Sequence, residues 1–144
     1  MIDKKAPPRY TPAKPVTIAT LLEMKRKGLK IAMLTAYDFP TARLAEEAGV
    51  DVILVGDSVG MTKLGYTSTL PVTVEEMLHH TKAAARGSVR ALIVADMPYL
   101  SYEVDPKEAL RHAGRLLKEG GAHAVKVEGG MEIAATVKEL LKVN

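Results

Sequence analysis

The sequence predicts an α/β protein built from repeated strand–helix units around a parallel sheet. Three short apolar runs typical of buried strands each end in an acidic residue, at Asp57, Asp96 and Glu128. The segments between these runs have the apolar periodicity of amphipathic helices. Repeated units of this kind form a parallel sheet that is either open and doubly wound or closed into a barrel. A complete (β/α)8 barrel needs about 250 residues, so four units in 144 residues make half of one.

The chain is expected to begin with an extended arm, residues 1–15, that holds four of the eight prolines. Residues 16–144 are expected to form a single domain around this sheet, whether open or part of a barrel. A helix is predicted at 17–27, because its apolar residues share one stripe and Gly28 follows at the position of a C-terminal cap.

Strands and helices are then expected to alternate. Strands are predicted at 30–35, 50–55, 90–95 and 124–127, and helices at 41–48, 73–86, 105–120 and 131–143. Two helix starts are explicit: Thr73 with Glu76 forms a capping box, and Asp105 precedes a proline at the first helical position. The long loop 58–72 is expected to be functional or disordered.

Composition excludes several functional classes. The absence of cysteine excludes disulfides, thiolate metal sites and cysteine nucleophiles. No apolar run approaches the roughly 20 residues of a membrane helix, and no signal-peptide core is present, so a cytoplasmic protein without a membrane partner is expected. Residues 1–15 carry the whole net charge of +3. Because the remainder is neutral and has no basic stripe, no nucleic-acid partner is expected.

The residues that follow the strands form the predicted site. Strand carboxyl ends meet on one face of a parallel array, so Asp57 and Asp96 are expected to lie close together. Two such carboxylates repel each other unless a cation or a shared proton intervenes, and oxygen ligands suit Mg²⁺. Lys126 and Glu128 point to one side of their strand, and the lysine needs a carboxylate or a bound anion. Ser58 lies in a turn whose N–H groups are positioned to receive an anion.

Each of these residues also has a structural interpretation. Asp57 and Asp96 are compatible with ordinary turn-forming aspartates, and Lys126 with Glu128 is compatible with an ion pair that lines a barrel. The histidines, which lack metal-ligand spacing, are expected to be structural: His79, His80, His112 and His123.

Five motifs in one order carry a family resemblance: 33–38 (MLTAYD), 55–60 (VGDSVG), 65–73 (GYTSTLPVT), 95–98 (ADMP) and 125–130 (VKVEGG). This series resembles the ketopantoate hydroxymethyltransferase (3-methyl-2-oxobutanoate hydroxymethyltransferase) family. The resemblance implies a (β/α)8 TIM-type barrel, of which this chain supplies the N-terminal helix and about the first four βα units. It also implies a homo-oligomer, usually a decamer, and a transferase of pantothenate biosynthesis.

The resemblance further implies transfer of a one-carbon unit from 5,10-methylenetetrahydrofolate to 3-methyl-2-oxobutanoate, which yields 2-dehydropantoate. By motif, Asp57 and Asp96 would bind Mg²⁺, and Glu128 would complete the metal site directly or through water. Ser58 and Lys126 would hold the keto acid, whose oxygens chelate the metal beside both aspartates. Tyr37 would border the pocket.

The second half of the family carries a Gly-His-x-Gly-Leu-Thr-Pro-Gln motif and the glutamate thought to act as general base. This sequence ends at Asn144, before both, so its catalytic base is unknown and a fragment of a longer protein or a natural half-barrel is expected. Two other functions stay open. One is a Mg²⁺-dependent keto-acid enzyme of the phosphoenolpyruvate mutase and isocitrate lyase kind. The other is a non-catalytic truncated barrel that only binds metal and keto acid.

Overall fold

The computed structural model describes residues 14–143. The predicted arm therefore lies outside the described residues, apart from Lys14 and Pro15, which are both exposed. The first helix is confirmed: α1 spans Ile18–Arg26, and the side chain of Thr17 accepts a hydrogen bond from the main chain of its first turn. Gly28 has a φ of +66°, the left-handed conformation that ends helices and that only glycine adopts readily.

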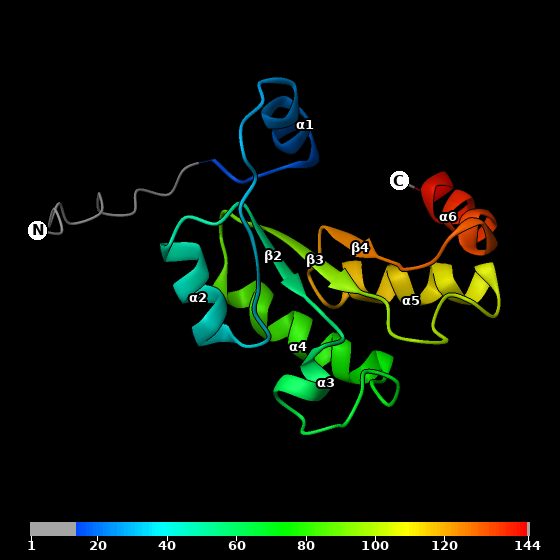
Figure 1. Ribbon diagram of the computed structural model, residues 1–144. Coiled ribbons are helices and arrows are strands. Elements are labelled where there is room, and N and C mark those ends of the chain that lie inside the picture. Colours follow the sequence, from blue (N-terminus) through cyan, green and yellow to red (C-terminus); the bar gives the residue numbers. More distant parts are fainter. Residues whose placement is uncertain (1–13, 144) are drawn as a thin grey trace, which may run out of the picture.

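Four parallel strands form the sheet in the order β1-β2-β3-β4, so neighbours in the sequence are neighbours in space. Helix α2 packs against α4 and α4 against α5, on one side of the sheet (Figure 1). A doubly wound sheet reverses its strand order, whereas the order of the four strands within residues 14–143 runs without a reversal. The elements are β1 (Met33–Thr35), α2 (Phe39–Glu47), β2 (Val52–Val55), α4 (Val74–Gly87), β3 (Leu92–Asp96), α5 (Pro106–Lys118) and β4 (Ala124–Lys126).

The two faces of the sheet have different partners. Alternate residues such as Ile53 and Ile93 are fully buried in the main core, which contains residues of the flanking helices. On the opposite face Val52 and Leu92 pack in a smaller cluster with Val16, whose main-chain N–H donates to the carbonyl of Arg90. Alternation of side chains along a strand places these two sets on opposite faces.

Several predicted bounds change. β1 is only three residues long and exposed, and residues 30–32 stay outside it. The main-chain N–H of Ala32 donates to the side chain of Asp51 (2.9 Å) in place of a ladder carbonyl, so pairing with β2 begins at Met33. Helix α2 begins two residues earlier than predicted, because Asp38 caps it with Pro40 in the first turn.

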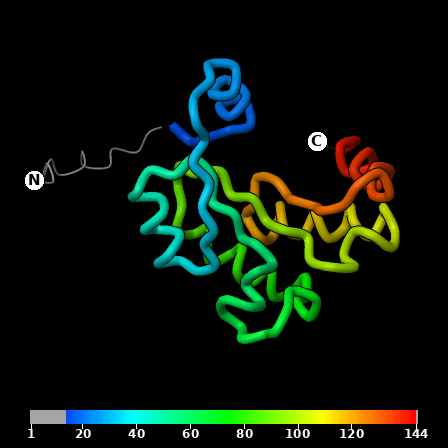
Figure 2. Tube along the Cα trace, viewed as in Figure 1, coloured from blue at the N-terminus to red at the C-terminus, as the bar shows by residue number. Residues whose placement is uncertain are grey.

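The other differences concern short helices. The predicted loop 58–72 contains α3 (Val59–Thr62), which lies beyond the carboxyl end of β2 (Figure 2). The predicted helix 131–143 is divided into a 3₁₀ turn, η1 (Met131–Ile133), then α6 (Ala134–Leu140) and a second turn, η2 (Leu141–Val143). No helix within residues 14–143 is long and apolar enough to cross a membrane.

The capping box at the start of α4 is confirmed, and it makes a testable contribution to stability. The hydroxyl of Thr73 accepts from the N–H of Glu76 (3.2 Å), and the Glu76 carboxylate accepts from the N–H of Thr73 (2.7 Å). We expect Thr73→Ala to lower the free energy of unfolding by about 1 kcal/mol, because one N-terminal donor of the helix loses its acceptor. Urea denaturation measures this change. Thr67→Ala, at an exposed threonine of the preceding loop, is the control, and an equal loss there would contradict the assignment.

Candidate active site at the carboxyl ends of the strands

The predicted site residues of β3 and β4 meet through strand register. Asp96 and Lys126 are direct partners in the parallel pairing of these strands, so their side chains lie on the same face. The ammonium of Lys126 lies 3.0 Å from Oδ2 of Asp96 and 2.8 Å from Oε1 of Glu128. Asp57 joins the group from β2, because its main-chain N–H donates to Oδ2 of Asp96 over 3.2 Å. The structure therefore brings together four of the five predicted residues.

Burial distinguishes the charges in this group. Asp96 is only 3% exposed, and loss of solvent raises its pKa above the usual aspartate value, even though Lys126 opposes the shift. Burial alone would lower the pKa of Lys126, but hydrogen bonds to Glu128 and Asp96 outweigh it and raise the pKa. The pKa of the exposed Glu128 carboxyl is lowered by its hydrogen bond to Lys126. Lys126 is therefore positively charged at neutral pH, but its charge does not fully offset the cost of burying the Asp96 carboxylate.

A glycine permits the close approach of β2 to Asp96. A side-chain Cβ at Gly56 would lie 2.8 Å from Oγ of Ser58 and 3.3 Å from Oδ2 of Asp96. The first distance is too short for an ordinary contact, so any larger residue would displace the serine or the carboxylate. Gly56 in the motif 55–60 is therefore needed for close packing at the site.

Ser58 is bound to a different neighbour. Its hydroxyl forms a 2.8 Å hydrogen bond with the hydroxyl of Tyr37, a largely buried residue that follows β1. The imidazole Nδ1 of His80 in turn donates to the carbonyl of Tyr37 (2.7 Å). Tyr37 thus lies beside the predicted site, with its hydroxyl orienting the serine.

Three of the four histidines form hydrogen bonds to the main chain, in agreement with the structural role that the sequence predicted. His79 is exposed, and His80 packs against the end of β1. His112 bonds the carbonyl of Ser101 (2.8 Å), and His123 accepts from the N–H of Ile93 (3.0 Å) at the amino end of the sheet. These bonds engage main-chain groups, which is typical of histidines that hold a fold together.

A small pocket of about 130 Å³ opens over this group. Its walls include residues that the sequence analysis did not predict, of which Met97 and Tyr102 are the most buried. The signal for them was the two loops 58–72 and 97–104, since loops at the carboxyl ends of strands collect functional residues. The lining residues are Asp57, Thr69, Leu70, Asp96, Met97, Tyr99, Tyr102, Glu103, Lys126 and Glu128.

The aspartates have features that suit a divalent cation. Oδ1 of Asp96 is buried and has no hydrogen-bond partner within the described residues. The nearby charge of Asp57 raises the pKa of Asp96, so the two carboxylates repel each other. A hard cation that binds oxygen would satisfy both. Across residues 14–143, however, no three acidic or histidine side chains lie close enough together to hold a metal, and Glu128 is paired with Lys126 instead.

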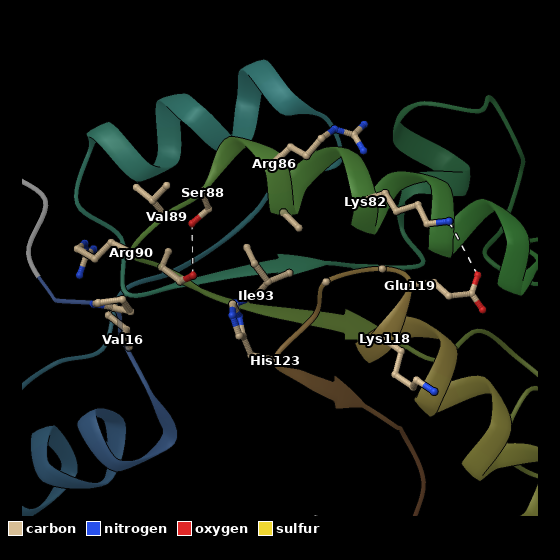
Figure 3. Close-up of a pocket in the computed structure, with 15 residues that line it drawn as sticks. Val16, Lys82, Arg86, Ser88, Val89, Arg90, Ile93, Lys118, Glu119 and His123 are labelled. Atoms are coloured by element: carbon tan, nitrogen blue, oxygen red, sulfur yellow. Dashed lines mark hydrogen bonds and ion pairs between the residues drawn. The ribbon is translucent and has the colours of Figure 1, made fainter.

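A larger pocket of about 500 Å³ lies at the opposite, amino end of the sheet (Figure 3). None of the predicted site residues lines it. Its basic side chains include Arg86 and Lys118, which stand in the last turns of α4 and α5, and Lys82 lies 3.9 Å from Glu119. Cations at helix C-termini offset the negative end of the helix dipole. This pocket therefore has a structural explanation, and the carboxyl ends of the strands are the better candidate.

Comparison with known proteins agrees with the motif resemblance. The family profile for ketopantoate hydroxymethyltransferase matches residues 15–144. A 3-methyl-2-oxobutanoate hydroxymethyltransferase of Carboxydothermus hydrogenoformans is 63% identical over 126 residues, which cover 88% of this chain and 46% of the relative. The relative of the same name in Moorella thermoacetica is 55% identical, with 90% of this chain and 48% of the relative covered. The chain spans about half the length of the curated relatives it matches.

Solved structures confirm the barrel-type fold. Phosphoenolpyruvate phosphomutase from Streptomyces platensis subsp. rosaceus aligns with a TM-score of 0.68 at 20% identity, covering 88% of this chain and 49% of that one. Oxaloacetate acetylhydrolase aligns at 0.63 with 17% identity, covering 90% and 49%. At these identities the likeness concerns the fold alone: half of a (β/α)8 barrel. The profile match over nearly the whole sequence identifies the lineage, and the chain belongs to the ketopantoate hydroxymethyltransferase family.

Proposed function

We propose that this chain provides the substrate- and metal-binding half of a hydroxymethyltransferase. The reaction transfers a one-carbon unit from 5,10-methylenetetrahydrofolate to 3-methyl-2-oxobutanoate and yields 2-dehydropantoate. The observation that carries the proposal is the convergence of Asp57, Asp96 and Lys126 at one pocket in a member of this family. The identity of 63% to a relative that bears the enzyme's name supports it.

In this proposal Asp57 and Asp96 hold Mg²⁺, with Glu128 available directly or through water. When bound, the ion stabilises as a Lewis acid the negative charge that develops on the keto oxygen. The ammonium of Lys126 attracts and orients the anionic keto acid, and its pKa, raised by Glu128 and Asp96, keeps it protonated at neutral pH. In the same proposal the Ser58 hydroxyl, which bonds the hydroxyl of Tyr37, would donate a hydrogen bond to the substrate. The general base of the family is expected in the second half of the barrel, so we assign that role to no residue here.

Removal of Mg²⁺ is expected to abolish binding of the keto acid. Because two buried or half-buried carboxylates repel an anionic substrate, the ion is needed to reverse the local charge. Ligand-detected NMR of 3-methyl-2-oxobutanoate with the protein should show saturable binding with Mg²⁺ and none with EDTA. Equal binding under both conditions would contradict the proposed metal site.

The same samples allow two controls. 3-Methylbutanoate lacks the keto oxygen and cannot chelate, so it should not bind with or without Mg²⁺. Exchange of the C3 proton in D₂O reports whether a base is present, separately from binding. A screen of oxaloacetate and phosphoenolpyruvate distinguishes the mutase-like alternative, and binding without any exchange fits a chain that binds metal and keto acid only.

The expected homodecamer, the folate co-substrate and the cytoplasmic location remain predictions.

A further inference from the structure

The phenol of Tyr102 forms two hydrogen bonds to the main chain of a single site residue. Its oxygen accepts from the N–H of Glu128 over 3.1 Å and lies 2.9 Å from the carbonyl of Glu128, to which the hydroxyl donates. The side chain is only 5% exposed. The tyrosine hydroxyl thus satisfies both the main-chain N–H and the main-chain carbonyl of Glu128. These are the groups that a neighbouring strand would otherwise bond.

This contact lies where the regular pairing of β4 stops. The ladder between β3 and β4 ends at Lys126, and a bond from the N–H of Met97 to the carbonyl of Lys126 (3.0 Å) closes it. Glu128 lies two residues further on, in a segment without strand structure. Tyr102 therefore holds the end of the segment that carries Lys126 and Glu128, and so fixes where the lysine ammonium lies.

Tyr102 is itself held by an unusual turn. The N–H of Ser101 donates to the carbonyl of Pro98 (3.0 Å), and Leu100 between them has a φ of +62°. This conformation is costly for a branched, bulky residue, and the Leu100 side chain is 54% exposed, so burial does not compensate for it. The imidazole of His112 on α5 holds the turn by donating to the carbonyl of Ser101 (2.8 Å). Because neighbouring contacts maintain this strained turn, we conclude that the turn serves to position Tyr102, which follows it.

We infer that Tyr102 is a positioning residue of the keto-acid site, which acts by holding Glu128 and through it Lys126. The inference rests on the proposed function, since it concerns the affinity for the same substrate. It assigns Tyr102 no contact with the reacting atoms. Its role is to keep the lysine beside Asp96, where one ammonium neutralises the buried carboxylate and faces the pocket.

The experiment compares Tyr102→Phe with Tyr99→Phe in the purified protein. Both changes remove one phenolic oxygen from the wall of the same pocket, but Tyr99 is 52% exposed and its hydroxyl has no hydrogen bond within the described residues. Two readouts are taken at a temperature where circular dichroism shows both variants folded. One is the amide signal and hydrogen exchange of Glu128 by ¹⁵N NMR, and the other is the Kd for 3-methyl-2-oxobutanoate in saturating Mg²⁺.

We expect Tyr102→Phe to shift the Glu128 amide signal, to speed its exchange at least tenfold and to raise the Kd about tenfold. Tyr99→Phe should change neither by more than about twofold. A Kd unchanged in Tyr102→Phe, despite a displaced Glu128 amide, would overturn the inference and leave Tyr102 a purely structural residue. Failure of the unmodified protein to bind the keto acid would instead refute the proposed function, and the inference with it, while the Glu128 amide would still report the contact itself.

Discussion

Asp96→Asn is expected to weaken Mg²⁺-dependent binding of 3-methyl-2-oxobutanoate by on the order of 100-fold. The change keeps the shape of the side chain but removes the one negative charge that is buried at the pocket and paired with Lys126. Removing a partner from a desolvated charge pair has effects of this size, because the remaining charge loses its compensation. Isothermal titration in saturating Mg²⁺ measures the loss.

The matched control for this change is Glu103→Gln. Glu103 lines the same pocket but is exposed, so the same loss of charge should alter the Kd by no more than about twofold. Circular dichroism establishes that both variants are folded. Binding by Asp96→Asn that matches the unmodified protein would show that Asp96 is not a ligand of the metal or the substrate.

Glu46→Ala is expected to lower the free energy of unfolding by about 3 kcal/mol. Glu46 is completely buried on α2, and its carboxylate accepts hydrogen bonds from the hydroxyl of Ser88 (2.6 Å) and the N–H groups of Arg90 (2.8 Å) and Ala91 (2.9 Å). The alanine would leave these donors without their acceptor in the interior. It would also release the connection between α4 and β3, which sets the position of Asp96.

The neighbouring residue provides the control. Glu47 is exposed and pairs with Arg43 across one helical turn (3.0 Å), so Glu47→Ala should change stability by less than about 0.5 kcal/mol. Urea denaturation of both variants compares them directly. Equal effects would mean that the buried carboxylate contributes no more than a surface ion pair.

Local patterns in the sequence were sufficient for most of the fold. The capping residues Thr73 and Asp105 marked the starts of α4 and α5, and apolar runs marked the inner strands. These signals lie within a few residues of the element they define. The exposed edge strand β1 and the short helix α3 were poorly predicted. β1 has no buried face, and α3 is only four residues long, which is too short for a periodic pattern.

The candidate site, too, was predicted from the sequence only in part. Their positions after the strands predicted that Asp57, Asp96, Lys126 and Glu128 lie at one edge of the sheet. The motif series predicted the family from the sequence alone. The roles of Tyr102 and Gly56 depended on distances between segments that are not adjacent in the sequence, and no local pattern encodes those distances.

The sequence by itself determined which elements form, where their polar residues fall and to which family the chain belongs. Only the tertiary structure decided that Lys126 pairs with Asp96, because strand register sets which residues lie side by side. It likewise decided that Glu46 holds the segment leading into β3, and that Tyr102 holds the one following β4. The physical reason is the distance along the sequence over which each interaction acts. Helix caps and periodicity act over a few residues, whereas burial and cross-strand contacts depend on the packing of the whole sheet.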